Sequence, residues 1–190
     1  MYKQKVVLGV APTKRSFLSM EEAKRQKDKF MARIRAIKPE AVEIIDVDEL
    51  CENGIMWDTA KIPAVVEKFR RVGIDALFLP FCDFGEEQVV AQIAGAFKVP
   101  TLVWGARDER PNSDEVRGRD TQCGMFAATK VLRRYGVKYS YIWNCETESD
   151  DFAKGYENFI RVAAVLKALK NLRIPDEPIP VHRDTAFSTR

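Results

Sequence analysis

Two Arg-Asp pairs bracket a long polar segment near the middle of the chain. Arg107 and Asp108 follow a short apolar run, and Arg119 and Asp120 stand just before a helical pattern begins. Arginine and aspartate form bidentate hydrogen bonds, so the pairs could clamp the segment or meet a neighbouring subunit. Polar segments of this length are uncommon in compact domains, and many are functional. We therefore treat these four residues as candidate loop or interface residues.

Two other turns carry residues that could contact a ligand. Lys14 and Arg15 follow the first apolar run, where they could bind an anion or a polyol or be ordinary surface charge. This loop has no glycine after Gly9, so it does not predict a phosphate cradle. Glu86 and Glu87 follow the third run, where carboxylates also favour the first turn of a helix. Both turns are candidate binding loops, although for the second, taken alone, helix-start chemistry is favoured.

The sequence shows no complete catalytic or metal-binding set. Cys123 near a helix start could be a reactive thiolate, but it has no partner base, and a buried structural thiol is favoured. The four cysteines form no C-x-x-C pair, and His182 is the only histidine. Four carboxylates could gather at the sheet edge, although we do not expect a metal cluster: Asp83, Glu86, Glu87 and Asp108. We predict no catalytic residue and no metal site in this chain.

The composition is typical of a soluble single domain. The chain has 190 residues, of which 46% are hydrophobic and 31% charged, with a formal net charge of +3. Basic residues are spread along the chain, whereas nucleic-acid binding needs a concentrated stripe. The sequence has no signal-peptide pattern and no apolar run long enough for a membrane, so we expect a cytoplasmic protein without nucleic-acid or membrane partners. A proline-rich segment follows Ile174, so we expect one domain over 1–174 and a tail or linker over 175–190.

Five apolar runs alternate with five helical patterns, and these elements must position the polar side chains. The expected strands are Val6–Ala11, Ala41–Val47, Asp75–Pro80, Pro100–Gly105 and Lys138–Asn144. Their continuous Val, Ile and Leu content is typical of parallel strands covered by helices on both faces. Strict alternation favours right-handed crossovers and a doubly wound sheet. We predict an α/β fold with a five-stranded parallel sheet of flavodoxin-like order 2-1-3-4-5, and a crevice between strands one and three.

Helix boundaries are marked by residues that satisfy exposed backbone groups. Ser19 and Glu22 predict a capping box at the start of the first helix. Asp120-Thr121 offers an N-cap to the fourth helix, which we expect over about Gln122–Tyr135.

Three motifs follow one another along the chain. They are Pro80-x-x-x-Phe84-Gly85-Glu86-Glu87, Trp104-Gly105-x-Arg107-Asp108-Glu109 and Arg119-Asp120-Thr121-Gln122-Cys123-Gly124-Met125-Phe126-Ala127. The ordered series resembles the amino-terminal domain of the L-fucose/L-arabinose isomerase-like superfamily, over about residues 5–173.

The resemblance implies a flavodoxin-like first domain followed by two more domains. Such enzymes interconvert an aldose and a ketose through an enediol, using Mn2+ or a similar divalent ion and carboxylates of the later domains. The first domain instead helps to close the sugar site of a neighbouring subunit. The corresponding positions here are Arg15 in the first loop and Phe81–Glu86 in the third. Cys82 falls near the place of the aromatic residue that covers the sugar, so Phe81 or Phe84 would have to substitute for it.

We therefore expect the amino-terminal domain of a sugar isomerase-like protein, as a fragment or a truncated gene product. It would supply subunit contacts in a homo-oligomer and part of a sugar pocket, hold no cofactor itself, and be inactive alone. The alternative is a stand-alone module that binds a small polyol or anion, or has a regulatory role. A flavin or nucleotide binder would rest on the fold alone, since no loop chemistry supports it.

Overall fold

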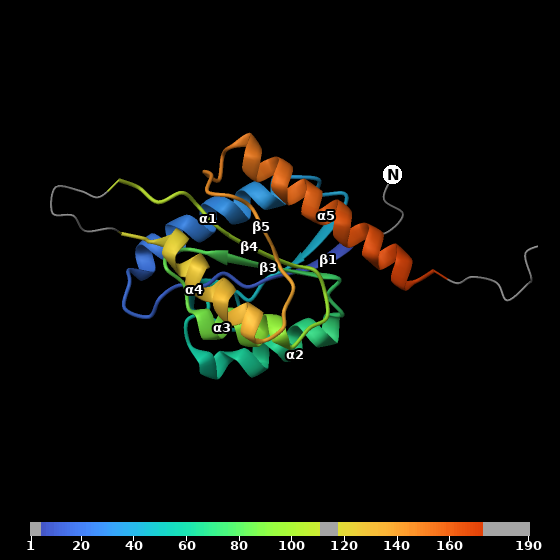
Figure 1. Ribbon diagram of the computed structural model, residues 1–190, viewed down its shortest axis with the longest axis horizontal. Coiled ribbons are helices and arrows are strands. Elements are labelled where there is room, and N and C mark those ends of the chain that lie inside the picture. Colours follow the sequence, from blue (N-terminus) through green and yellow to red (C-terminus); the bar gives the residue numbers. More distant parts are fainter. Residues whose placement is uncertain (1–4, 111–117, 173–190) are drawn as a thin grey trace, which may run out of the picture.

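The computed structural model describes residues 5–110 and 118–172, which fold around a parallel β-sheet (Figure 1). Within these residues the strands lie in the order β2-β1-β3-β4-β5. The strands are β1 Val6–Val10, β2 Val42–Ile45, β3 Ala76–Phe81, β4 Thr101–Gly105 and β5 Ser140–Tyr141. All neighbouring strands pair in parallel, which confirms the predicted α/β fold of flavodoxin-like order.

Helices cover both faces of this sheet, and each face has its own hydrophobic core. The helices are α1 Met20–Ala36, α2 Ile62–Val72, α3 Glu87–Gly95, α4 Thr121–Arg134 and α5 Asp150–Lys170, with short 3-10 turns at Glu52–Gly54 and Thr59–Lys61. Figure 1 shows α1 and α5 on one side of the sheet and α2, α3 and α4 on the other. Successive strand residues point to opposite faces, so Phe78 belongs to the core beneath α1 and α5 and Leu79 to the other core.

The two edge strands are shorter than predicted. β2 covers four residues of the predicted 41–47, and β5 covers two residues of the predicted 138–144. Ser140 and Tyr141 pair with Leu102 and Val103 of β4. An edge strand has a neighbour on one side only, and a short edge also limits unwanted pairing with other chains.

Serine side chains begin α1 and α5. Ser19 Oγ accepts a hydrogen bond from the Glu22 amide at 3.2 Å, and Ser149 Oγ accepts one from the Phe152 amide at 3.1 Å. The Glu22 carboxylate, which the sequence predicted to complete a capping box, instead accepts hydrogen bonds from the Arg25 guanidinium on the surface of α1. The predicted N-cap at Ser19 is therefore confirmed, whereas Glu22 does not complete the predicted capping box.

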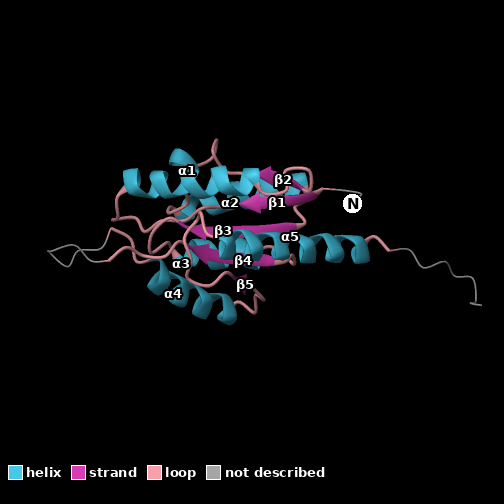
Figure 2. Cartoon of the chain, turned by 90° about the horizontal axis from the view of Figure 1, so that it is seen from above, coloured by secondary structure: helices cyan, strands magenta, loops and turns pink. Residues whose placement is uncertain are grey.

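The longest helix, α5, has 21 residues and closes the core beside α1. Figure 2 shows its C-terminal end running past the amino ends of the strands. The predicted tail over 175–190 and His182 lie outside the described residues. Within the described ranges, no helix has both the length and the apolar content needed to cross a membrane.

Candidate functional site

The loops after β1 and β3 are joined at the carboxyl edge of the sheet. The Thr13 amide donates to the Pro80 carbonyl at 2.9 Å, and the Cys82 amide donates back to the Thr13 carbonyl at 2.9 Å. The Thr13 hydroxyl accepts a hydrogen bond from the Glu86 amide, also at 2.9 Å. Both loops therefore lie together at the switch point between β1 and β3, where open α/β sheets bind ligands.

Arg15 is held at this edge by two carboxylates and an aromatic ring. Its Nη1 donates to Glu86 at 3.0 Å, and its Nη2 donates to Glu87 at 2.5 Å. Its guanidinium carbon lies 4.6 Å from the centroid of the Phe84 ring, which is a cation–π contact. The Arg15 side chain is 16% exposed, so it presents a small polar surface whose charge is balanced by its partners.

Asp83 fixes the backbone beneath Arg15. Its Oδ1 accepts hydrogen bonds from the amides of Arg15 at 2.7 Å and Gly85 at 2.8 Å. Gly85 has a φ of +72°, a conformation that glycine adopts without strain. The other oxygen, Oδ2, is buried and accepts no hydrogen bond from the described residues. Burial raises the pKa of the Asp83 carboxyl, although its two amide partners oppose the shift.

Lys14 is a second cation, buried within the same loop. It is 2% exposed, and its Nζ donates to the carbonyl oxygens of Arg15 at 2.6 Å and Ser16 at 3.4 Å. A buried ammonium requires such partners, so Lys14 holds the shape of the loop. Of the two cations in this loop, Arg15 is the one nearer the surface.

The structure brings together three of the five predicted substrate contacts, Arg15, Phe84 and Glu86. The other two are buried, with Phe81 1% exposed and Cys82 fully enclosed. Their side chains belong to cores on opposite faces of the sheet. Burial raises the pKa of the Cys82 thiol well above its ordinary value. Neither side chain reaches the surface of this edge in the domain as described.

Phe17 is a surface residue that the sequence analysis did not single out. It lies two residues beyond Arg15, and it is 82% exposed. A signal for it was present in the sequence, because Phe17 stands before the capping Ser19 and outside the apolar stripe of α1. It belongs to neither core, so we treat it as a candidate contact residue in the same loop as Arg15.

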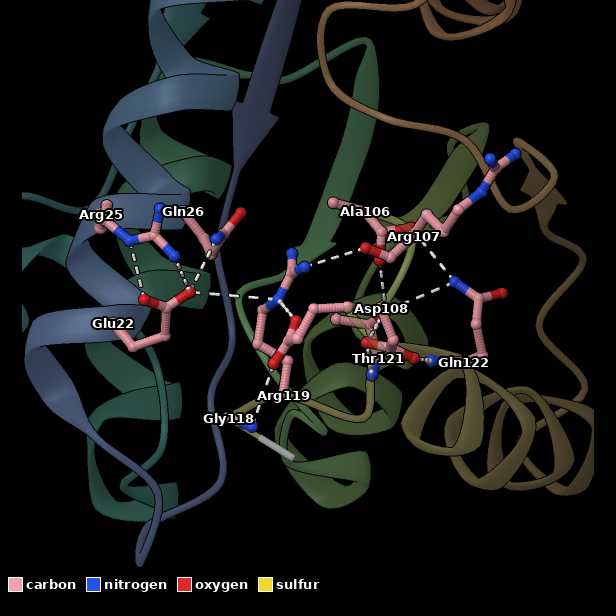
Figure 3. Close-up of polar contacts among 12 residues, drawn as sticks. Glu22, Arg25, Gln26, Ala106, Arg107, Asp108, Gly118, Arg119, Thr121 and Gln122 are labelled. Atoms are coloured by element: carbon pink, nitrogen blue, oxygen red, sulfur yellow. Dashed lines mark hydrogen bonds and ion pairs between the residues drawn. The ribbon is translucent and has the colours of Figure 1, made fainter. Parts of the chain in front are cut away.

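A second polar network joins the two ends of the segment between β4 and α4 (Figure 3). The Asp108 carboxylate accepts hydrogen bonds from the amides of Thr121 at 2.8 Å and Gln122 at 3.2 Å. The Thr121 hydroxyl donates to the same carboxylate at 2.9 Å. Asp120, the cap predicted from the sequence, stands at the N-cap position, but its side chain makes no capping hydrogen bond. Asp108, thirteen residues before Thr121, caps α4 instead.

Arg119 ties this network to α1, as Figure 3 shows. Its Nε donates to Glu109 at 2.7 Å, and its Nη2 donates to the Arg107 carbonyl at 2.9 Å. The same Nε lies 3.9 Å from the Glu22 carboxylate of α1. Burial alone would raise the pKa of Glu109, but its hydrogen bonds, including the one from Arg119, lower it. The arginine therefore joins two elements that are distant in the sequence.

The predicted Arg-Asp clamp takes a different form in the structure. The carboxylate facing Arg119 is that of Glu109, and Arg107 donates to the Asn144 carbonyl at 3.0 Å. Cys123 is exposed, so the prediction of a buried structural thiol is wrong. Residues 111–117 of this segment lie outside the described part of the chain. A contact with a neighbouring subunit stays a prediction for these residues.

The described residues do not fit the divalent metal site that the resemblance implies for whole enzymes. Across 5–110 and 118–172, no three His, Cys, Asp or Glu side chains are placed to share an ion. Asp83 accepts from backbone amides, and Glu86 and Glu87 bind Arg15. Asp108 caps α4. The four carboxylates considered from the sequence thus serve four structural contacts rather than one ligand set.

The sheet order and the joined loops define a flavodoxin-like α/β domain whose β1 and β3 loops meet at the carboxyl edge of the sheet. The chain belongs to the family of the fucose/sulfoquinovose isomerase N-terminal domain, whose model matches residues 9–170. This match confirms the resemblance that the three sequence motifs carry. The matched residues include both polar networks, the one around Arg15 and the one around Asp108 and Arg119. No curated protein matches the chain.

Solved structures with a similar arrangement include two azoreductases. The azoreductase from Bacillus anthracis str. Sterne is 12% identical, with a TM-score of 0.37, over 88% of this chain and 98% of its own. Azoreductase AzrA is 11% identical, with a TM-score of 0.36, over 84% of this chain and its entire length. At this level of similarity, neither carries an argument about ligand or reaction.

Proposed function

We propose that this chain is the sugar-facing domain of an aldose–ketose isomerase. It contributes Arg15 and Phe17 to a pocket that is completed by residues outside the described part of the chain, in a further domain or a neighbouring subunit. The observation that supports this most directly is the Arg15 cluster at the β1/β3 edge, within a family match over residues 9–170.

The charge of the cluster favours a neutral polyol over an anion. Arg15 is bound by both Glu86 and Glu87, and the Asp83 carboxylate lies directly beneath it. These carboxylates offset the positive charge of Arg15 and Lys14, so an anionic ligand would gain little attraction here. A sugar hydroxyl can instead donate to a carboxylate and accept from the guanidinium at the same edge.

Phe17 is the aromatic residue best placed to cover a sugar ring. Phe81 is buried in the core, and one face of the Phe84 ring is occupied by the Arg15 guanidinium. Phe17 is exposed in the same loop as Arg15. The apolar face of a sugar packs on such a ring, while its hydroxyl groups face polar side chains.

The domain binds and encloses the sugar, and the proton transfer takes place on groups supplied from elsewhere. Moving a proton between adjacent sugar carbons needs a positioned base and an electrophile for the developing oxyanion. The carboxylates at the described edge are committed to Arg15 and to backbone amides. The isolated chain is therefore expected to bind sugars weakly and not to isomerise them.

Saturation-transfer NMR on the isolated chain tests the binding half of this proposal. The panel contains neutral pentoses, 6-deoxyhexoses and a hexose sulfonate, and an isomerase assay with Mn2+ runs in parallel. We expect contact with the neutral sugars, less with the sulfonate, and no turnover. Turnover by this chain alone would overturn the assignment of catalysis to other groups.

Two variants locate the contact on the chain. Phe17→Ala and Arg15→Met should each reduce the transfer signal severalfold, because they remove the ring and the hydrogen-bond donor. Arg25→Met is the matched control, since Arg25 is an exposed arginine that pairs with Glu22 on α1. Equal signals in all three variants would show that sugars do not contact this edge.

A further inference from the structure

An aromatic groove lies at the outer edge of the sheet, between β5 and α4. Its volume is about 380 Å3, within the range of roughly 300–1,000 Å3 that is usual for small-molecule sites. β3 and β4 separate β5 from β1, so the groove is distinct from the Arg15 cluster. The proposed function makes no use of it.

One wall of the groove is a row of aromatic side chains in β5 and on either side of it. Tyr139, Tyr141 and Trp143 all line it. Ile142, between Tyr141 and Trp143, also lines the groove, but it is buried and its side chain packs beside Gly155 of α5. Tyr141 is 57% and Trp143 68% exposed, and their ring centroids lie 6.1 Å apart. Two large rings are therefore held in contact at the surface, outside either core.

The other wall is a stripe of α4 that does not face the core. Phe126, Lys130 and Arg133 line the groove at spacings of four and three residues, which places them on one face of the helix. Phe126 is 65% exposed, whereas the core side of α4 is formed by Ala128 and Leu132. The groove thus combines three exposed rings with two cationic side chains.

Charge on this surface has one sign. Lys130 and Arg133 are cationic, and none of the described residues that line the groove is acidic. The Arg15 edge differs, because carboxylates offset the cation there. An apolar ligand would bury these cations without compensation, whereas an anionic group would pair with them.

We infer that the groove binds a small ligand with a planar aromatic ring and a negatively charged group. The ring stacks between Phe126 and the Tyr141–Trp143 pair, and the anionic group faces Lys130 and Arg133. An added β-strand fits less well, because β5 offers only two residues for pairing. The chemistry of this ligand is inferred from the residues that line the groove. It does not depend on whether a sugar binds at the Arg15 edge.

Calorimetric titration with naphthalene-1-sulfonate tests this inference directly. Naphthalene-1-methanol is the neutral probe of similar shape, and cyclohexanesulfonate is the anion without an aromatic ring. We expect the aromatic sulfonate to bind at least about tenfold more tightly than either, since each lacks one of the two recognised features. Equal affinity for the neutral and anionic rings would overturn the inference.

Substitutions then assign the site. Trp143→Leu should weaken binding about three- to tenfold, as expected for the loss of one aromatic contact. The double variant Lys130→Gln/Arg133→Gln should remove the preference for the sulfonate. Trp57→Leu is the control for the tryptophan, because Trp57 is a partly exposed tryptophan that lines a different pocket. Lys154→Gln/Arg161→Gln on α5 is the control for the charge change.

Sedimentation of the same samples separates a small ligand from a second copy of the chain. If the aromatic wall is an interface between copies, Trp143→Leu will convert an oligomer to a monomer and the sulfonate will not bind the wild type. That result would overturn the inference in favour of self-association. Sulfonate binding with an unchanged mass supports it, and circular dichroism confirms that each variant is folded.

Discussion

At the residue scale, the Asp83 carboxylate holds two backbone amides in place, but it is buried where a negative charge is unfavourable. One carboxylate oxygen accepts hydrogen bonds from the amides of Arg15 and Gly85, so it fixes the loop after β1 relative to the loop after β3. The other oxygen is buried without a hydrogen bond from the described residues. Desolvation of the charged form outweighs the amide contacts and raises the pKa of the carboxyl above its ordinary value of 3.8.

This raised pKa predicts how the difference in unfolding free energy between the wild type and the variant Asp83→Asn changes with pH. A raised pKa in the folded state means that folding favours the protonated Asp83 carboxyl. The stabilisation from this carboxyl is therefore complete below its unfolded-state pKa and is lost as the pH rises through its folded-state pKa. Asparagine keeps an oxygen acceptor for the two amides but does not titrate. The free energy of unfolding of the wild type, measured relative to the variant, should therefore fall as the pH rises from 3.8.

Urea denaturation at a series of pH values, from about 4 to about 7, measures this difference. A difference between the two proteins that is constant over this range would contradict the prediction. A difference that increases with pH would reverse its sign, and would mean that the amide contacts dominate over burial.

At the element scale, α4 packs against the loop after β3 without space for a side chain at Gly124. A Cβ atom placed there would lie 1.7 Å from the Phe84 carbonyl oxygen, which belongs to the backbone and cannot rotate away. Helix propensity alone predicts that Gly124→Ala stabilises the protein by about 1 kcal/mol. The clash predicts the opposite sign, with a loss of at least about 2 kcal/mol.

Thermal and urea unfolding of Gly124→Ala decide between these signs. Ala127→Gly in the same helix is the control, and it should lose about 1 kcal/mol from helix propensity. If Gly124→Ala is more stable than the wild type, α4 does not approach the Phe84 backbone as closely as the structure describes.

Asp108 makes a second prediction for α4. Its carboxylate caps the helix through the Thr121 and Gln122 amides, so Asp108→Ala should lower the free energy of unfolding by about 1–2 kcal/mol. Asp108→Asn keeps an acceptor oxygen and should lose less. Urea denaturation of both variants measures the cap, and an equal loss in the two would show that the charge, rather than the hydrogen bond, carries the effect.

Much of the element arrangement could be predicted from the sequence because it depends on local pattern. Apolar runs and helical spacing identify the elements, and the handedness of crossovers then restricts the strand order. The cap of α4 could not be predicted in this way. Asp120 has the right residue type beside the helix, but the capping carboxylate comes from Asp108 across an intervening loop.

The candidate site could also be predicted only in part from the sequence. Arg15 and Glu86 are 71 residues apart, and the topology alone predicts that their loops meet. The direction of each side chain depends on where the strand ends. β3 extends to Phe81, one residue further than predicted, so the alternation of the strand carries Phe81 into the core. Phe17, in the first loop, is exposed, whereas Phe81 of the other loop is buried.

At the scale of the whole molecule, α5 is attached to the sheet at the edge opposite the Arg15 cluster. Lys167 Nζ donates to Asp75 Oδ2 at 2.7 Å and to the Lys5 carbonyl at 2.8 Å. Asp75 Oδ2 also accepts a hydrogen bond from the Val7 amide at 2.9 Å. One carboxylate therefore joins the C-terminal part of α5 to the starts of β1 and β3.

Lys167→Met should weaken this attachment while keeping the length and the apolar stem of the side chain. The paired side chains of Lys167 and Asp75 are 19% and 18% exposed, so the pair lies between a surface ion pair and a buried one. We expect a loss of about 1–2 kcal/mol and a fall in Tm of about 3–6 °C. Lys170→Met is the control, because both lysines lie in the last turn of α5 and interact with the same helix dipole. Calorimetry that finds equal shifts for the two variants would assign the effect to the helix end, and α5 would then be held on the sheet by its apolar face alone.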